Sequence, residues 1–158
     1  VAMEINRTWL LKVSFLKQII KDVEFSPHGP EFFAFIVHVS QKMYLQVHAQ
    51  SEVFGEPHVL YILSLGLASN AMRLLQTGAV WGADFVLSNK RYLENFETFA
   101  LTYVEVTALH RTDFMSLVDQ HRDACPEIAL RVRRFCCWIA LQREVLCEAK
   151  RRQVGEEA

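Results

Sequence analysis

The stretch Phe99-Ala100-Leu101-Thr102-Tyr103-Val104-Glu105-Val106-Thr107-Ala108-Leu109 alternates with a period of two residues. The residues of odd number and those of even number are both largely apolar or prone to β-structure. A strand with one solvated face would show one polar set instead. The pattern therefore predicts a single strand that is covered on both faces.

Shorter stretches with the same period precede it along the chain. Tyr44–His48, Val59–Leu65 and Met72–Gln76 alternate at least in part. The turn regions between and after them contain Gly55-Glu56-Pro57, Leu65-Gly66-Leu67, Gly78 and Gly82. Several short strands at turn spacing predict an antiparallel β-sandwich or barrel of the jelly-roll type.

Both ends of the chain show a helical period instead. The predicted helices cover Thr8–Ile20 (capped by Asn6), Glu31–Met43, the segment from Thr112 or Asp113 to Val118, and Pro126 to about Arg152. A capping residue or a proline in the first turn marks the start of most of them. The expected fold class is α+β, with an antiparallel β jelly-roll core, N-terminal helices and a long C-terminal helix.

Composition excludes several classes of protein. The 158 residues make one domain, and 51% apolar with 22% charged residues excludes intrinsic disorder. Lys and Arg total 17 against 18 Asp and Glu, so the net charge of −1 offers nothing to attract nucleic acid. No run is long and apolar enough for a membrane span, and no signal peptide is visible. The start at Val1 suggests a piece of a longer protein.

Four local motifs, in this order, resemble the cyclic nucleotide-binding domain superfamily. They are Val59–Gly66, Thr77–Gly82, Phe99–Val106 and His110–Phe114. The first looks like the strand and turn of the family, and the second like the approach to its phosphate-binding cassette. The third and fourth look like the strand after that cassette and the start of the following helix. The resemblance covers nearly the whole chain.

Two further stretches resemble the ether-à-go-go class of voltage-gated potassium channels. Asn6–Leu16 is similar to the end of the linker that joins a channel pore to this domain, and Ala100–Tyr103 is followed by the acidic Glu105. The resemblance implies a cytosolic regulatory domain of a homotetrameric channel, at the cytosolic face of a membrane. Its partners would be the pore, the linker and neighbouring subunits. Residues 1–25 would end the linker, 26–152 form the domain, and 153–158 a frayed tail.

The cassette of this chain lacks the chemistry that a cyclic nucleotide needs. A phosphate favours a guanidinium that pairs with two oxygens, and a ribose hydroxyl favours a carboxylate. In the family a Gly-Glu pair opens the cassette and an Arg follows near its end, positions that match Gly82, Ala83 and Glu94 here. Loss of such a charge pair costs about 2–5 kcal/mol, or roughly 30-fold to a few thousand-fold in affinity. We expect a pocket that does not bind cyclic nucleotide and needs no cofactor.

The alternative is a genuine cAMP or cGMP sensor. A shifted register would bring Lys90 or Arg91 to the phosphate, and Asp84 would take the role of the missing glutamate. Backbone N–H groups at a helix start would also remain, because they survive any change of side chain.

The resemblance also assigns a role to the last helix, which closes over the pocket in this family. Phe135, Trp138 and Ile139 are the expected lid residues. In the ether-à-go-go class a short stretch after the last helix takes the place of the ligand. The matching region here starts near Arg143, ends by Ala158 and has no aromatic plug, so Trp138 is another candidate.

Other functions find little support in the residues. No nucleophile has a paired base, so we expect no enzyme. His38, His48 and His58 are ten residues apart, which predicts no metal site. Cys136 and Cys137 are adjacent and so form no CxxC motif. The cysteines of the chain as a whole are typical of reduced, cytosolic usage. The basic residues of the last helix predict a solvated face or a weak contact with anionic lipid: Arg131, Arg133, Arg134, Lys150, Arg151 and Arg152. A transcription regulator would need a helix-turn-helix after that helix.

Overall fold

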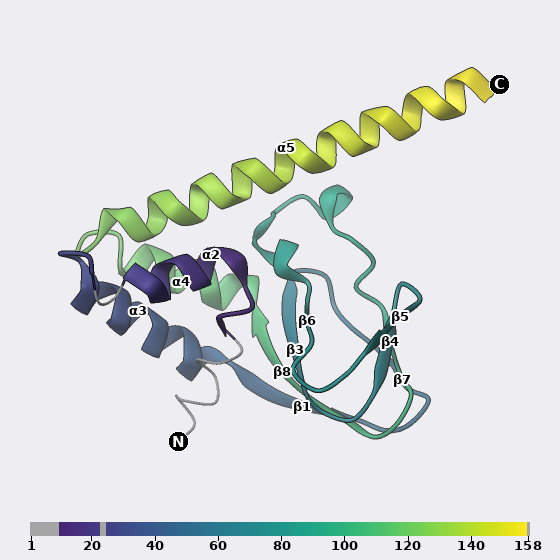
Figure 1. Ribbon diagram of the computed structural model, residues 1–158, viewed down its shortest axis with the longest axis horizontal. Helices are drawn as coiled ribbons and strands as arrows, with labels where there is room; N and C mark the ends of the chain where they lie inside the picture. The colour runs from purple at the N-terminus through teal and green to yellow at the C-terminus, as the bar shows by residue number, and fades with distance from the viewer. Residues whose placement is uncertain (1–9, 23–24, 158) are drawn as a thin grey trace.

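The computed structural model describes residues 10–22 and 25–157, and it places a β-sandwich beside a group of helices (Figure 1). Helices α2, α3 and α4 lie together at one end, and α5 runs along one side of both parts. In chain order the elements are α2 (Ser14–Asp22), α3 (Gly29–Lys42), β1 (Tyr44–His48), β2 (Val53–Phe54), β3 (Val59–Leu65), β4 (Ala68–Asn70), β5 (Arg73–Leu75), β6 (Val80–Trp81), η1 (Ala83–Val86), η2 (Lys90–Tyr92), β7 (Thr98–Ala100), β8 (Val104–His110), α4 (Arg111–Gln120) and α5 (Pro126–Glu157).

The eight strands form two antiparallel sheets with jelly-roll connectivity. One sheet has the order β1-β8-β3-β6 and the other β2-β7-β4-β5. Apart from the β4–β5 hairpin, each strand is followed by a strand of the opposite sheet, which is the double Greek-key arrangement of a jelly roll. The predicted fold class is therefore confirmed, including the helices at both ends and the long last helix.

The prediction of one strand over Phe99–Leu109 is wrong. Strand β7 ends at Ala100 and β8 begins at Val104, and the two belong to different sheets. Between them the N–H groups of Leu101 and Thr102 both donate to the carbonyl oxygen of Leu67, at 3.0 and 3.2 Å. The chain crosses from one sheet to the other there. Apolar residues occur at both odd and even positions because the stretch is two strands, and each of them has one face toward the core.

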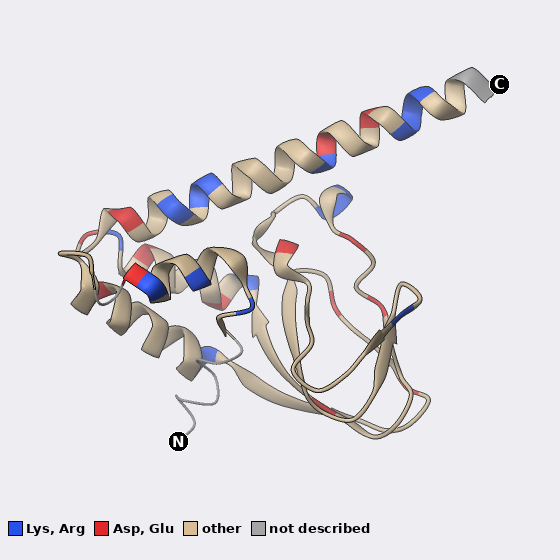
Figure 2. Cartoon of the chain, in the orientation of Figure 1, with Lys and Arg blue, Asp and Glu red and all other residues tan. Residues whose placement is uncertain are grey.

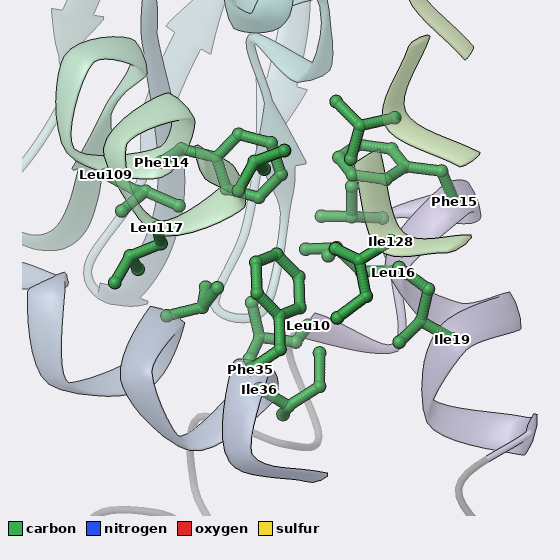
Figure 3. Close-up of a cluster of buried hydrophobic side chains, with 14 of the residues drawn as sticks. Leu10, Phe15, Leu16, Ile19, Phe35, Ile36, Leu109, Phe114, Leu117 and Ile128 are labelled. Atoms are coloured by element: carbon green, nitrogen blue, oxygen red, sulfur yellow. The ribbon is translucent and has the colours of Figure 1, made fainter. Parts of the chain in front are cut away.

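The hydrophobic core has two parts. One fills the sandwich, where Tyr61 and Trp81 stack with ring centroids 5.5 Å apart. The other joins the helices to the sheet that contains β3 and β8. Figure 3 shows Phe15, Phe35 and Phe114, from three different helices, converging with Leu109 of β8 and Ile128 of α5. This second part fixes the helices, and with them the start of α5, on the sandwich.

Three helix predictions need correction. The helix expected over Thr8–Ile20 is interrupted by a turn at residues 11–13, which buries both Leu10 and Val13; Thr8 itself lies outside the described residues. Helix α3 begins at Gly29, before Glu31, because Pro30 in the first turn sacrifices no helical hydrogen bond. The cap of α4 is His110, whose Nδ1 accepts from the Thr112 N–H at 3.0 Å.

The last helix is longer than expected. It continues past Arg152 to Glu157, through the segment predicted as a frayed tail. In the described part of the chain, no helix combines the length and apolar character that crossing a membrane requires.

Candidate functional site

A cavity of about 240 Å³ lies between the sandwich and α5. Its walls come from the start of β3, from β6 and η1, from the loop before β7, and from one face of α5. The lining residues are Glu56, His58, Val59, Asn70, Arg73, Val80, Trp81, Gly82, Ala83, Asp84, Leu93, Glu94, Asn95, Phe96, Ile139 and Arg143. The cavity is slightly below the usual size range of small-molecule sites, about 300–1,000 Å³.

Gly82 turns the chain from β6 into η1 at the wall of this cavity. Its φ of +76° lies in the left-handed region, and a Cβ there would stand 2.5 Å from the carbonyl oxygen of Val59. Only glycine satisfies both conditions without strain. The turn places Ala83 and Asp84 side by side in the cavity lining, next to Glu94 from the following loop.

Asp84 is a buried carboxylate, with 7% of its surface exposed. Its Oδ2 accepts a hydrogen bond from the backbone N–H of Glu94 at 2.8 Å, which fixes the loop against η1. Burial raises the pKa of Asp84 above its ordinary value, while the Glu94 N–H and the positive charge of Arg143 lower it. Because burial dominates, this carboxyl holds its proton more tightly than an exposed one.

Arg143 of α5 reaches into the cavity and contacts two carboxylates. Its Nη1 lies 2.6 Å from Glu94 Oε1, and its Nη2 lies 3.6 Å from Asp84 Oδ2. The arginine is partly buried and Asp84 is buried, whereas Glu94 is exposed. The three side chains thus form an ion cluster in which the last helix supplies the cation and the cassette segment supplies both anions.

Lys90 and Arg91 lie in η2, outside this cavity. The Nζ of Lys90 lies 5.7 Å from the ring centroid of Phe96, and Arg91 pairs with Glu144 of α5 at 3.5 Å. The Tyr92 hydroxyl also donates to Glu144 at 2.5 Å. Arg91 and Tyr92 thus hold α5 at a second point beside the ion cluster, and neither Lys90 nor Arg91 lines the cavity.

The three expected lid residues have different surroundings. Phe135 stacks on Phe15 of α2 with ring centroids 4.3 Å apart, and Ile139 lines the cavity. Trp138 is 58% exposed and does not line the cavity; it lines a neighbouring surface groove together with Glu94 and Arg143.

Sequence reasoning did not assign Arg143 or Arg73 to the cavity. Arg143 stands four residues after Ile139, a spacing that puts both on one helix face, so this signal was available. Arg73 comes from the two-stranded hairpin β4–β5. The position of this hairpin relative to the cassette depends on how the sheet pairs, which the local sequence does not show. Asn70 of the same hairpin donates to the carbonyl oxygens of Asn95 and Glu97, both at 3.0 Å, and so holds the loop that carries Glu94.

No protein-family model and no curated protein sequence matches this chain. Among solved structures, it is similar to the crystal structure of the N-terminal domain of a transcriptional regulator from Streptomyces coelicolor A3(2), with 17% identity, 70% of this chain and 84% of that chain covered, and a TM-score of 0.49. It is also similar to the structure of "Sp-2Cl-cAMPS bound to PKAR CBD2", with 18% identity, 82% and 88% covered, and a TM-score of 0.47. At these values neither likeness says what this chain binds.

Proposed function

We propose that this chain is a regulatory domain of the cyclic nucleotide-binding-like type, and that its own last helix closes the pocket where a nucleotide would bind. The observation behind the proposal is the ion cluster of Arg143, Glu94 and Asp84 in the cavity. An entering phosphate would have to displace Glu94 from the arginine. It would also meet the negative charge of Asp84 in a partly buried site, where repulsion is poorly screened.

We place this domain at the cytosolic face of a membrane, in a homotetrameric potassium channel. The support is the resemblance of Asn6–Leu16 to a pore linker, together with the packing of the described part of that segment. Helix α2 contacts α5 through the Phe15–Phe135 stack and through the Asp22–Arg131 ion pair at 2.6 Å. A change in the packing of α5 would therefore reach α2 directly and shift the population of gate states.

The second candidate is a genuine cAMP or cGMP sensor. Two arginines, Arg73 and Arg143, line the cavity, and a guanidinium is the group that pairs best with a phosphate. In this case Arg143 would exchange Glu94 for the nucleotide phosphate, and α5 would move with it.

Calorimetric titration of the chain with cAMP and with cGMP separates the two candidates. We expect no saturable heat, because Arg143, the partly buried arginine of the cavity, is already paired with Glu94 and Asp84. Saturable binding with a micromolar constant would establish the sensor and contradict the closed pocket.

A gain-of-function variant tests the position of the cassette. Ala83→Glu combined with Glu94→Arg restores the carboxylate and the guanidinium of the family and removes Glu94, the nearer of the two partners of Arg143. We expect this double variant to bind cAMP or cGMP measurably, and Ala83→Glu alone, as the control, to show no binding. A folded double variant without binding would mean that residues 83 and 94 do not face the nucleotide phosphate and ribose.

The gating role needs the full-length protein. In patch-clamp recordings we expect Arg143→Ala to shift the voltage at which the channel opens, since the variant releases α5 from the cassette. Unchanged gating in a channel that reaches the membrane would contradict the proposed coupling.

A further inference from the structure

Two histidines from distant parts of the sequence meet where α3 and α4 pack together. His38 Nδ1 lies 2.9 Å from His121 Nε2, 83 residues later in the chain. The ring centroids are 5.1 Å apart, so the rings meet edge to edge through these nitrogens and are not stacked. The spacing of His38, His48 and His58 predicts no metal site, but spacing cannot reveal a partner on another helix. Two imidazole nitrogens that face each other are a candidate pair of metal ligands.

The distance between the two nitrogens is close to the one that a shared metal ion requires. A Zn–N bond is about 2.0–2.1 Å long, so two nitrogens on one tetrahedral zinc ion lie about 3.3 Å apart. Starting from the observed 2.9 Å, the rings need to separate by only about 0.4 Å.

The protonation of the two rings also suits a metal ion. A hydrogen bond between the rings leaves a proton on one of the facing nitrogens, whereas a metal ion needs a lone pair on both. Each neutral ring can instead carry its proton on the far nitrogen, which is Nε2 in His38 and Nδ1 in His121. In residues 10–22 and 25–157 neither far nitrogen has a hydrogen-bond partner that would prevent this.

The pair can be reached from solvent, and no carboxylate lines its entrance. His38 is exposed and opens on a surface groove of about 370 Å³, whereas His121 behind it is buried. The charged residues of α3 are Glu31 in its first turn and Lys42 in its last, and the helix between them is tan in Figure 2. The residues that line the groove are His38, Gln41, Lys42, Leu117 and Gln120. The available ligands are therefore imidazole nitrogens, amide oxygens and water.

We propose that His38 and His121 bind one divalent ion of a late transition metal, which joins α3 to α4. Imidazole suits Zn²⁺, Ni²⁺ and Cu²⁺, whereas Mg²⁺ and Ca²⁺ take oxygen ligands. Within the part of the chain that the structure describes, no third His, Cys, Asp or Glu joins the pair. Water and the amide oxygens of Gln41 or Gln120, which line the groove, complete the coordination.

A metal ion at this position holds the two helices together at the edge of their core. Phe35 of α3 packs against His121 and against Phe114 of α4, with ring centroids 5.5 and 5.9 Å away. An ion that binds the folded chain more tightly than the unfolded chain stabilises the fold. None of these residues lines the cavity beside α5, so the metal site is independent of whether that cavity binds a nucleotide.

Calorimetric titration of the chain with Zn²⁺ tests the site. A Cys137→Ser background removes the exposed thiol, which is a competing zinc ligand. We expect saturable binding of one ion per chain, and a higher midpoint of thermal unfolding with Zn²⁺ or Ni²⁺ but not with Mg²⁺ at the same concentration. Absence of saturable zinc binding overturns the proposal, and so does an equal effect of Mg²⁺.

Variants identify the ligands. His38→Gln changes an exposed residue, so the fold remains intact, and it should weaken zinc binding at least tenfold because one imidazole is left. His121→Ala should weaken it as much. His28→Gln is the control, since 44% of that side chain is exposed and it should change neither the affinity nor the thermal shift. Zinc binding that survives His38→Gln unchanged, or that His28→Gln weakens equally, overturns the proposal.

Nuclear magnetic resonance of the histidine ring nitrogens gives a readout that does not depend on stability. Zn²⁺ should shift the signals of His38 Nδ1 and His121 Nε2 and leave those of His48 and His58 unchanged. Zinc-dependent shifts of the His38 ring alone, or only of other histidines, contradict a site shared by α3 and α4.

Discussion

At Gly82 one backbone angle determines the shape of the cavity wall. A φ of +76° and a space of 2.5 Å between an added Cβ and the Val59 carbonyl oxygen exclude any other residue. The atom that would have to move belongs to the backbone of β3, the strand that pairs with both β6 and β8. Strain at this position therefore spreads into the middle of a sheet.

Gly82→Ala should destabilise the fold by about 2 kcal/mol or more, since a left-handed conformation alone costs an L-residue about 1–2 kcal/mol. Chemical denaturation monitored by tryptophan fluorescence measures this change. Gly155→Ala is the matched control, because nothing lies within 4 Å of its added Cβ in the exposed last turns of α5. The control should be neutral or slightly stabilising. Equal stability of the two variants would mean that the turn at Gly82 tolerates a side chain.

Asp84 gives the stability a dependence on pH with a defined sign. Its pKa in the folded state is raised by burial above the ordinary 3.8, so the folded state binds this proton more tightly than the unfolded state. The contribution of this group favours folding below pH 3.8 and is lost as the pH rises through the folded pKa. Asn has no proton to lose, so Asp84→Asn abolishes this decrease in stability at higher pH. The free energy of unfolding of the variant, relative to that of the parent, should therefore increase from pH 3 to pH 7.

Urea denaturation at several pH values checks the Asp84 prediction. Glu94→Gln is the control, because it removes a negative charge from the exposed end of the same ion cluster. If the two variants alter the pH dependence equally, burial of Asp84 is not the cause.

Some residues of the site can be predicted from the local sequence, whereas others come close to the cavity only when the chain folds. The motif at Thr77–Gly82 points to Gly82 and Ala83, and counting back from Ala100 without gaps points to Glu94; all three line the cavity. The partner of Glu94 is Arg143, 49 residues later in the chain. No periodicity within either segment specifies that contact, because it depends on the angle at which α5 crosses η1. The sequence therefore indicated an acidic cassette but not the cation that neutralises it.

Among the elements, length determines how well sequence predicts structure. The alternation over Tyr44–His48 and Val59–Leu65 matches β1 and β3 residue for residue. Strands β2 and β6 have only two residues each, too few for any period to be visible. The split between β7 and β8 was missed because the crossing at residues 101–103 continues the apolar alternation. Hydrogen bonds to Leu67, a distant residue, break the strand there.

Helices α3 and α4 meet at a pair of histidines. His38 Nδ1 and His121 Nε2 lie 2.9 Å apart, so one ring donates to the other, and the ring of Phe35 packs edge-on against His121. Burial, and secondly the charge of His38, lower the pKa of His121. The contact needs at least one neutral ring, because two imidazolium groups at this distance repel.

Acidification should therefore weaken the α3–α4 contact. The unfolded chain binds a proton at His121 near pH 6.5, whereas the folded chain binds it at lower pH, so stability decreases as the pH falls below about 6.5. His121→Gln keeps a hydrogen-bonding group at the Nε2 position and should flatten this decrease. His38→Gln removes the neighbouring charge but not the burial, so its effect should be smaller. Thermal denaturation between pH 5 and 8 gives the curves, and parallel curves for parent and His121→Gln would contradict the assignment.

On the scale of the whole molecule, α5 has a fixed half and a lightly held half. Its first part belongs to the helix core through Ile128, Val132 and the Phe15–Phe135 stack. Its middle is held to the sandwich chiefly by polar contacts, those of Arg143 with Glu94 and Asp84 and those of Glu144 with η2. Beyond them the helix extends past the sandwich (Figure 1). A helix attached in this way can swing away from the cassette while its root stays packed.

Arg143→Ala should release the middle of α5 without unfolding the molecule. Without the guanidinium, the neighbouring carboxylates of Asp84 and Glu94 have no cation between them and repel each other. The cassette also loses its ion pairs with the helix. Amide hydrogen exchange in residues 136–150 and in η2 should rise several-fold, while β3 and β8 keep their protection because their core is untouched. Leu141→Ala, on the opposite side of the same helix, is the control and should leave exchange in η2 unchanged. Uniformly faster exchange in the sandwich would show that α5 and the β core open together, and the lid could not then move as a separate body.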